Sequence, residues 1–67
     1  MTINALSDVI ASIIEAADEI RGKDGIDAQD YGQLLAYAET LSIIRDACDP
    51  DKLKEFGLDF DIDKRFL

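Results

Sequence analysis

The sequence has no histidine and no tryptophan, and it has one cysteine and one proline among its 67 residues. Without histidine it lacks the side chain most often used as a general base near neutral pH and as a nitrogen ligand for metals. Cys48 has no second cysteine with which to form a disulfide and no imidazole to activate it as a nucleophile. These absences predict a protein that is not an enzyme and that holds neither a metal nor another cofactor.

Basic residues are also scarce, because seven Lys and Arg face fifteen Asp and Glu, for a net charge of −8. Residues 1–44 hold eight acids against two bases, a net of −6, and residues 45–67 hold seven acids against five bases, a net of −2. A chain of this charge repels nucleic acid and anionic membranes and is attracted to basic surfaces. We therefore expect a basic protein surface as the partner, without direct binding to nucleic acid or membrane.

Long apolar runs are missing as well. None reaches the roughly 18 residues of a membrane-spanning helix, and Asp8 interrupts the first one too early for a secretory signal. A single unpaired cysteine suits a reducing compartment, so we expect a cytoplasmic protein. The length predicts one domain, residues 1–67, with a small core. Nine Ile and seven Leu could build that core in a monomer or share it in a homodimer.

What the sequence does contain is helical periodicity over residues 3–21. One face carries the apolar residues Ile3, Leu6, Ile10, Ile13, Ala17 and Ile20, at spacings of three and four. The opposite face is acidic and has no base before Arg21. Thr2 is the expected N-cap, and Arg21 with Gly22 suits the C-terminal end.

A second helix is predicted over residues 28–47, after a polar turn at residues 22–27. Asp27 is its expected N-cap, and Asp30 stands at the third helical position, where a carboxylate favours the helix N-terminus. Two helices of about 19 residues, each about 28 Å long, joined by so short a link form an antiparallel hairpin. The residues that we expect to be almost fully buried in it are Ile10, Ile13, Leu41 and Ile44.

The turn has a superficial similarity to a calcium-binding EF-hand loop. Placing Ile26 and Asp30 at loop positions 8 and 12 puts Arg21 and Lys23 at positions 3 and 5, where calcium requires oxygen ligands. Calcium binding is therefore not expected. Ser7 and Ser42 also lie outside the Asp-Ser-Leu sequence that carries phosphopantetheine in small acidic carrier proteins.

Asp49-Pro50 ends the second helix and begins a short third helix over residues 50–56, which Gly57 stops. Residues 58–63 then alternate strictly between apolar and acidic side chains, the pattern of extended backbone. This segment either crosses the hairpin as a strap or pairs with another chain. The predicted fold class is all-α: an antiparallel helical hairpin with a short third helix and an extended C-terminal strap.

Two acidic clusters are the candidate binding residues. Their members are Asp8, Glu15 and Glu19 on the first helix and Asp59, Asp61 and Asp63 on the C-terminal segment. On an extended strand the last three would stand about 6.6 Å apart, similar to the gap between successive phosphates of a nucleic-acid strand. The clusters thus fit either a nucleic-acid mimic or an acidic surface that only keeps the protein soluble.

In size, acidity and helical character, the whole chain resembles the small inhibitors that phages and mobile elements direct against host defence, notably anti-CRISPR proteins. The resemblance involves no motif, so no site residue is transferred. It implies a stoichiometric inhibitor, in the host-cell cytoplasm, that binds the nucleic-acid-binding surface of a CRISPR effector complex as a DNA mimic and blocks DNA binding. The alternative is a small helical structural or dimerisation module with a solubilising acidic surface.

Overall fold

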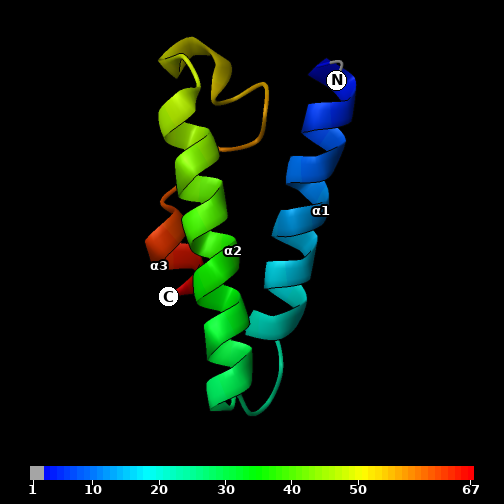
Figure 1. The fold of residues 1–67 in the computed structure, drawn as a ribbon, viewed down its shortest axis with the longest axis vertical. Coiled ribbons are helices and arrows are strands. Elements are labelled where there is room, and N and C mark those ends of the chain that lie inside the picture. The colour runs from blue at the N-terminus through cyan, green and yellow to red at the C-terminus, as the bar shows by residue number, and fades with distance from the viewer. Residues whose placement is uncertain (1–2) are drawn as a thin grey trace.

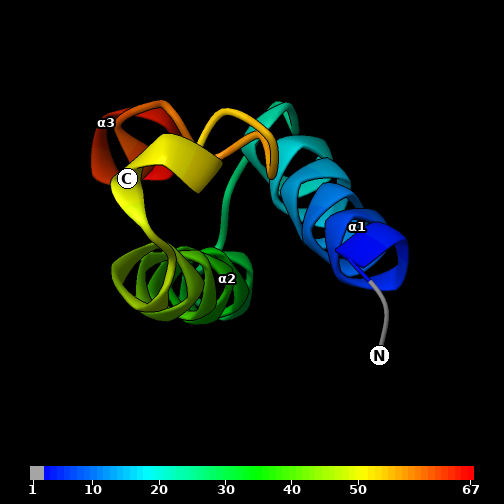
Figure 2. The same ribbon diagram turned by 90° about the horizontal axis from the view of Figure 1, so that it is seen from above.

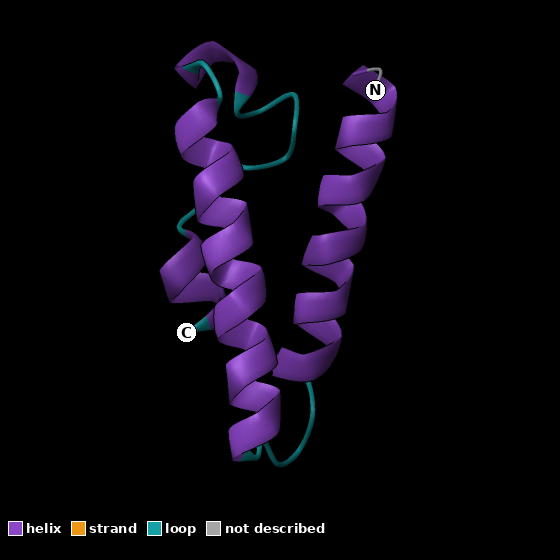
Figure 3. Cartoon of the chain, viewed as in Figure 1, coloured by secondary structure: helices purple, strands orange, loops and turns teal. Residues whose placement is uncertain are grey.

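The computed structural model describes the backbone of residues 3–67 and the side chains from residue 5 onward. Its elements are α1 (Ile3–Arg21), α2 (Ala28–Ala47), the 3-10 turn η1 (Pro50–Lys52) and α3 (Ile62–Phe66) (Figure 1). Residues 3–67 contain no strand, so the fold is all-α as predicted (Figure 3). The bounds of α1 and α2 match the prediction, whereas the predicted cap at Thr2 lies outside the described residues.

The start of α2 is fixed by a reciprocal capping box. The Asp27 carboxylate accepts a hydrogen bond from the Asp30 backbone N–H at 2.7 Å, and the Asp30 carboxylate accepts one from the Asp27 N–H at 3.5 Å. Two of the donors that a helix N-terminus leaves without partners are thereby satisfied. The prediction that Asp27 and Asp30 serve the helix start is confirmed. Gly22, in contrast, is not left-handed, because Gly57 is the only glycine of the described chain with positive φ.

The chain beyond α2 differs in detail from the prediction. Pro50 begins η1, but regular helix ends at Lys52 and turns follow up to Gly57, whose φ of 73° ends them as predicted. The extended backbone predicted for residues 58–63 stops at Asp61, which caps α3 by accepting a hydrogen bond from the Lys64 N–H at 3.1 Å. The third helix is thus C-terminal to the expected strap rather than N-terminal to it.

This difference has a physical reason in the spacing of the apolar residues. Leu58, Ile62 and Phe66 recur every four residues and are all buried. The alternation of Leu58, Phe60 and Ile62 hides that period, but only helical backbone after Asp61 brings Phe66 back to the side of Ile62. A five-residue helix has no stability of its own. It forms because helical backbone here lets these side chains pack against the hairpin.

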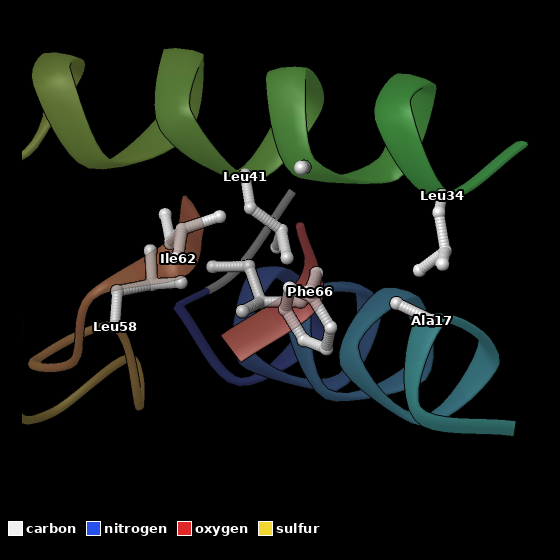
Figure 4. Packing of buried hydrophobic residues seen from close by; sticks show 8 residues of the cluster. Ala17, Leu34, Leu41, Leu58, Ile62 and Phe66 are labelled. Atoms are coloured by element: carbon white, nitrogen blue, oxygen red, sulfur yellow. The ribbon is translucent and has the colours of Figure 1, made fainter. Parts of the chain in front are cut away.

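The core lies between the hairpin and this C-terminal segment. Figure 2 shows α3 and the preceding loop lying over one side of the α1–α2 hairpin. The buried residues are Ile10, Ala17, Leu34, Ala38, Leu41, Leu58, Ile62 and Phe66. Figure 4 shows Phe66 among side chains from both long helices. The segment is therefore docked on its own hairpin, as the strap prediction required.

The other side of the hairpin stays open, and this corrects part of the predicted core. Ile10 and Leu41 are fully buried as predicted, but Ile13 and Ile44 are only partly buried, because nothing in the described chain covers them from that side. The molecule is elongated, 36 × 20 × 15 Å. Its accessible surface is 4606 Å², against about 4,200 Å² for a typical monomer of this mass. No helix of residues 3–67 is long and apolar enough to span a membrane.

Candidate protein-binding surfaces

The first candidate surface is the outward side of α1, where Asp8, Glu15 and Glu19 follow one another at spacings of seven and four residues. We call these three residues the α1 acidic face. All three side chains are exposed, and no ion pair within residues 3–67 involves them. Ser12 lies between them in sequence and donates its hydroxyl hydrogen bond to the Asp8 carbonyl oxygen at 2.9 Å. The three carboxylates are therefore available to a partner.

Two arginines, Arg65 and Arg45, hold the C-terminal segment in place. Arg65 of α3 makes a bidentate contact with Asp18, with Nη2 at 2.8 Å from Oδ2 and Nε at 3.3 Å from Oδ1. The same guanidinium lies over the rings of Phe60 and Phe66, 4.8 and 5.4 Å from their centroids. Arg45 of α2 donates a hydrogen bond to the Phe60 carbonyl oxygen at 3.2 Å. Asp18 therefore attaches the C-terminal segment to α1 and does not belong to the α1 acidic face.

A second ion pair braces the turn between the long helices. Lys23 Nζ lies 3.0 and 2.9 Å from the two carboxylate oxygens of Asp30. This hydrogen bond holds the pKa of Asp30 below its ordinary value of 3.8 and raises the pKa of Lys23 above 10.5. The Asp30 carboxylate thus accepts hydrogen bonds from the Lys23 side chain and from the Asp27 backbone N–H. Its negative charge therefore interacts with groups of the turn itself.

The second predicted cluster is split by the fold. Asp59, Asp61 and Asp63 are all exposed. Asp61 is the N-cap of α3, and Asp63 stands inside that helix, so the three carboxylates do not form the evenly spaced row of an extended strand. Asp63 instead lines a groove against α2. The structure therefore leaves the α1 acidic face as the only predicted cluster with its expected geometry among the described residues.

That groove is a feature that the sequence analysis missed. The α2–α3 groove has a volume of about 480 Å³, and its lining residues are Leu35, Ala38, Glu39, Ser42, Ile43, Asp46, Asp63 and Leu67. Ile43 is 70% exposed, Leu67 44% and Leu35 37%. One signal was present in the sequence as the pair Ile43-Ile44, because consecutive residues of a helix point about 100° apart and cannot both lie at the centre of one buried face.

A third surface is the open side of the hairpin. Its shallow groove, of about 420 Å³, is lined by Asp8, Val9, Ser12, Ile13, Ala16 and Tyr37. It borders the α1 acidic face through Asp8 and has no basic residue in its lining. An apolar contact and a carboxylate contact could therefore be made side by side there.

No cluster of three or more Asp, Glu, Cys or His side chains within residues 3–67 is arranged to hold a metal ion. Cys48 is partly buried at the end of α2.

Comparisons with known proteins returned no match, since no family model, no curated protein and no solved structure matches this chain. Function must therefore be inferred from the surfaces described above.

Proposed function

We propose that this protein is a stoichiometric inhibitor that binds a basic, nucleic-acid-binding surface of another protein as a DNA mimic and thereby prevents DNA from binding. The observation that supports the proposal is the α1 acidic face. Asp8, Glu15 and Glu19 present three exposed carboxylates along one helix, and no ion pair of the described chain neutralises them. On the partner protein, the Lys and Arg side chains that normally bind DNA phosphates would contact these three carboxylates.

The resemblance to small acidic anti-CRISPR proteins makes a CRISPR effector complex the first target to test. Such a complex has a basic channel for target DNA, and an inhibitor of it acts in the cytoplasm of the host cell. The proposed role is binding alone, with no catalysis and no cofactor. The partner is the protein surface itself, and the net charge of −8 opposes direct contact with nucleic acid.

Electrostatics sets the on-rate and the choice of partner, but it does not supply the whole affinity. Each exposed ion pair contributes about 0.2–1 kcal/mol, so three pairs contribute at most about 3 kcal/mol. A micromolar complex needs about 8 kcal/mol. Asp8 and Glu19 are eleven residues apart, which is about 16 Å along the helix. A single DNA strand carries about five phosphates over the same length, compared with the three carboxylates of the α1 acidic face. Apolar contacts must therefore add to those of the carboxylates.

The experiment is a competition gel shift with purified effector, its target duplex and rising amounts of this protein. Retained DNA should fall to zero near one equivalent per binding site. The triple variant Asp8→Lys, Glu15→Lys, Glu19→Lys should no longer compete. Its matched control, Asp24→Lys, Asp49→Lys, Asp51→Lys, has the same net charge and should compete at close to the native level. DNA binding that persists at saturating native protein would refute the proposal for that effector.

A dimerisation module is the second candidate function, because the exposed side chains of Leu35, Ile43 and Leu67 leave an apolar groove uncovered. Sedimentation at increasing protein concentration separates the two candidates. A monomer that inhibits supports the first. A tight dimer without inhibitory activity supports the second.

A further inference from the structure

We propose that the α2–α3 groove receives a basic amphipathic helix of the partner protein. The inference rests on the proposed function to the extent that this helix belongs to the partner's basic surface, and it names the element that supplies the apolar part of the affinity. The occupant is identified by its chemistry: apolar residues on one side of a helix of two to three turns, flanked by Lys and Arg.

The exposed apolar residues of α2 in the groove are separated by the length of a helix contact. Leu35 and Ile43 are eight residues apart on α2, about 12 Å along its axis. Leu67 closes the groove from the C-terminal segment. A docked helix presents anchors at positions i, i+4 and i+7, which span about 10 Å. The two exposed anchor points on α2 are thus matched to about two turns of a partner helix.

The acidic residues that line the groove determine the charge of the occupant. Glu39 and Asp46 on α2 and Asp63 on α3 supply a carboxylate on each of the two elements that form the groove, and its lining contains no Lys or Arg. Glu39 lies one turn from both Leu35 and Ile43 on the same side of α2, so Lys and Arg placed beside the apolar anchors of a docked helix would meet these carboxylates while the anchors cover Leu35 and Ile43. The groove therefore matches a basic amphipathic helix in the spacing of its apolar contacts and in charge.

The same charges disfavour a second copy of this chain as the occupant. A symmetric dimer through the groove would place Glu39, Asp46 and Asp63 of both copies around one apolar contact. Six carboxylates would gather there without a base in the lining, between two chains of net charge −8 each. Like charges brought together across an interface oppose association.

The test uses a designed probe in place of the unidentified partner. A helical peptide of about 15 residues carries Leu at positions i, i+4, i+7 and i+11 and Lys at flanking positions, and a second peptide of equal charge has each Leu replaced by Ser. Each peptide is titrated into the isotope-labelled protein, and backbone amide shifts are followed by NMR. The Leu peptide should shift the amides of residues 35–46 and 63–67. The Ser peptide should bind at least about tenfold more weakly.

Two matched variants of α2 add the same negative charge at different places. Ile43→Glu lies in the groove and should weaken binding of the Leu peptide at least about tenfold. Gln33→Glu is exposed outside the groove lining and should change binding less than about twofold. Circular dichroism should show that both variants keep the helical fold, because both substitutions are at exposed positions.

Three results would overturn the inference: shifts confined to the α1 acidic face, equal binding of the Leu and Ser peptides, or a native dimer in solution whose interface is the α2–α3 groove. Failure of the proposed function is seen separately. If the peptide binds the groove as described while the native protein does not displace DNA from the effector, the groove is a helix-binding site and the DNA-mimic proposal fails for that effector.

Discussion

Asp18 and Glu19 are neighbours in α1, yet they have different roles. Asp18 binds the guanidinium of Arg65 in a bidentate contact, whereas no ion pair within residues 3–67 involves Glu19. Consecutive residues of an α-helix point about 100° apart, so one turns toward α3 and the other toward solvent. The sequence shows both as acids on a polar face. Only the contact with Arg65, 47 residues away in the sequence, shows that Asp18 holds the C-terminal segment against α1.

At the same scale, burial separates residues that are equally apolar. Leu41 is fully buried, and Ile43 is 70% exposed although it lies on the same helix. Leu41→Ala should lower the free energy of unfolding by about 2–5 kcal/mol, and the melting temperature by at least about 8 °C. Ile43→Ala should change it by less than about 0.5 kcal/mol. Thermal melts of both variants test this core, and equal destabilisation would contradict it.

The Lys23–Asp30 contact makes a prediction about pH. Because its pKa is lowered by the hydrogen bond from Lys23, Asp30 contributes stability that is present above pH 3.8 and is lost as the pH falls through its lower folded-state pKa. Carbon-detected NMR titration should place the Asp30 pKa below 3.8. In Lys23→Gln it should move upward toward that value. A pKa that is the same in both proteins would show that the contact is not populated in solution.

At the scale of elements, the two long helices could be predicted because each satisfies several local rules at once. Apolar spacing, the Asp27 cap and the polar turn all agree with α1 and α2, and their bounds were predicted correctly. The C-terminal segment could not be predicted in the same way, since two periods compete there. The period-2 pattern around Phe60 is local, whereas the four-residue period of Leu58, Ile62 and Phe66 has meaning only against the hairpin.

The C-terminal segment is therefore expected to stabilise the fold. Phe66 is buried, and its ring packs edge-to-face on Phe60 with the Arg65 guanidinium over both. Phe66→Ala should lower the free energy of unfolding by about 3–5 kcal/mol, enough to unfold much of a small domain. Leu67→Ala, at a residue 44% exposed in the same segment, is the control and should have a small effect. Chemical denaturation measures both, and a Phe66→Ala protein as stable as the native one would show that the segment is not docked.

At the scale of the whole molecule, a two-helix hairpin covered on one side leaves apolar residues on the other. This explains why Ile13 and Ile44 are partly buried although their spacing predicts core positions. Periodicity identifies the face of a helix that is apolar, but the amount of chain left to cover it decides how deeply each residue lies. The α2–α3 groove escaped sequence analysis for a related reason, since it is formed by residues of α2 and α3 that meet only in the folded chain.

The proposed activity also belongs to this scale, because it depends on the distribution of all the charges. The native chain and the Asp24→Lys, Asp49→Lys, Asp51→Lys variant share an intact α1 acidic face. The Asp8→Lys, Glu15→Lys, Glu19→Lys variant has the same net charge as that control but loses the face. Comparing the two reversed proteins therefore separates the effect of total charge from that of its position.

The most direct measurement is the affinity of these three proteins for the purified effector across a salt series. Between 0.1 M and 1 M salt the Debye length falls from about 10 Å to about 3 Å, so the native affinity should fall steadily. The control variant should show a similar slope, and the variant without the α1 acidic face should bind weakly at every salt concentration. An affinity that does not depend on salt, or equal losses in the two triple variants, would contradict the proposal that Asp8, Glu15 and Glu19 bind a basic nucleic-acid site.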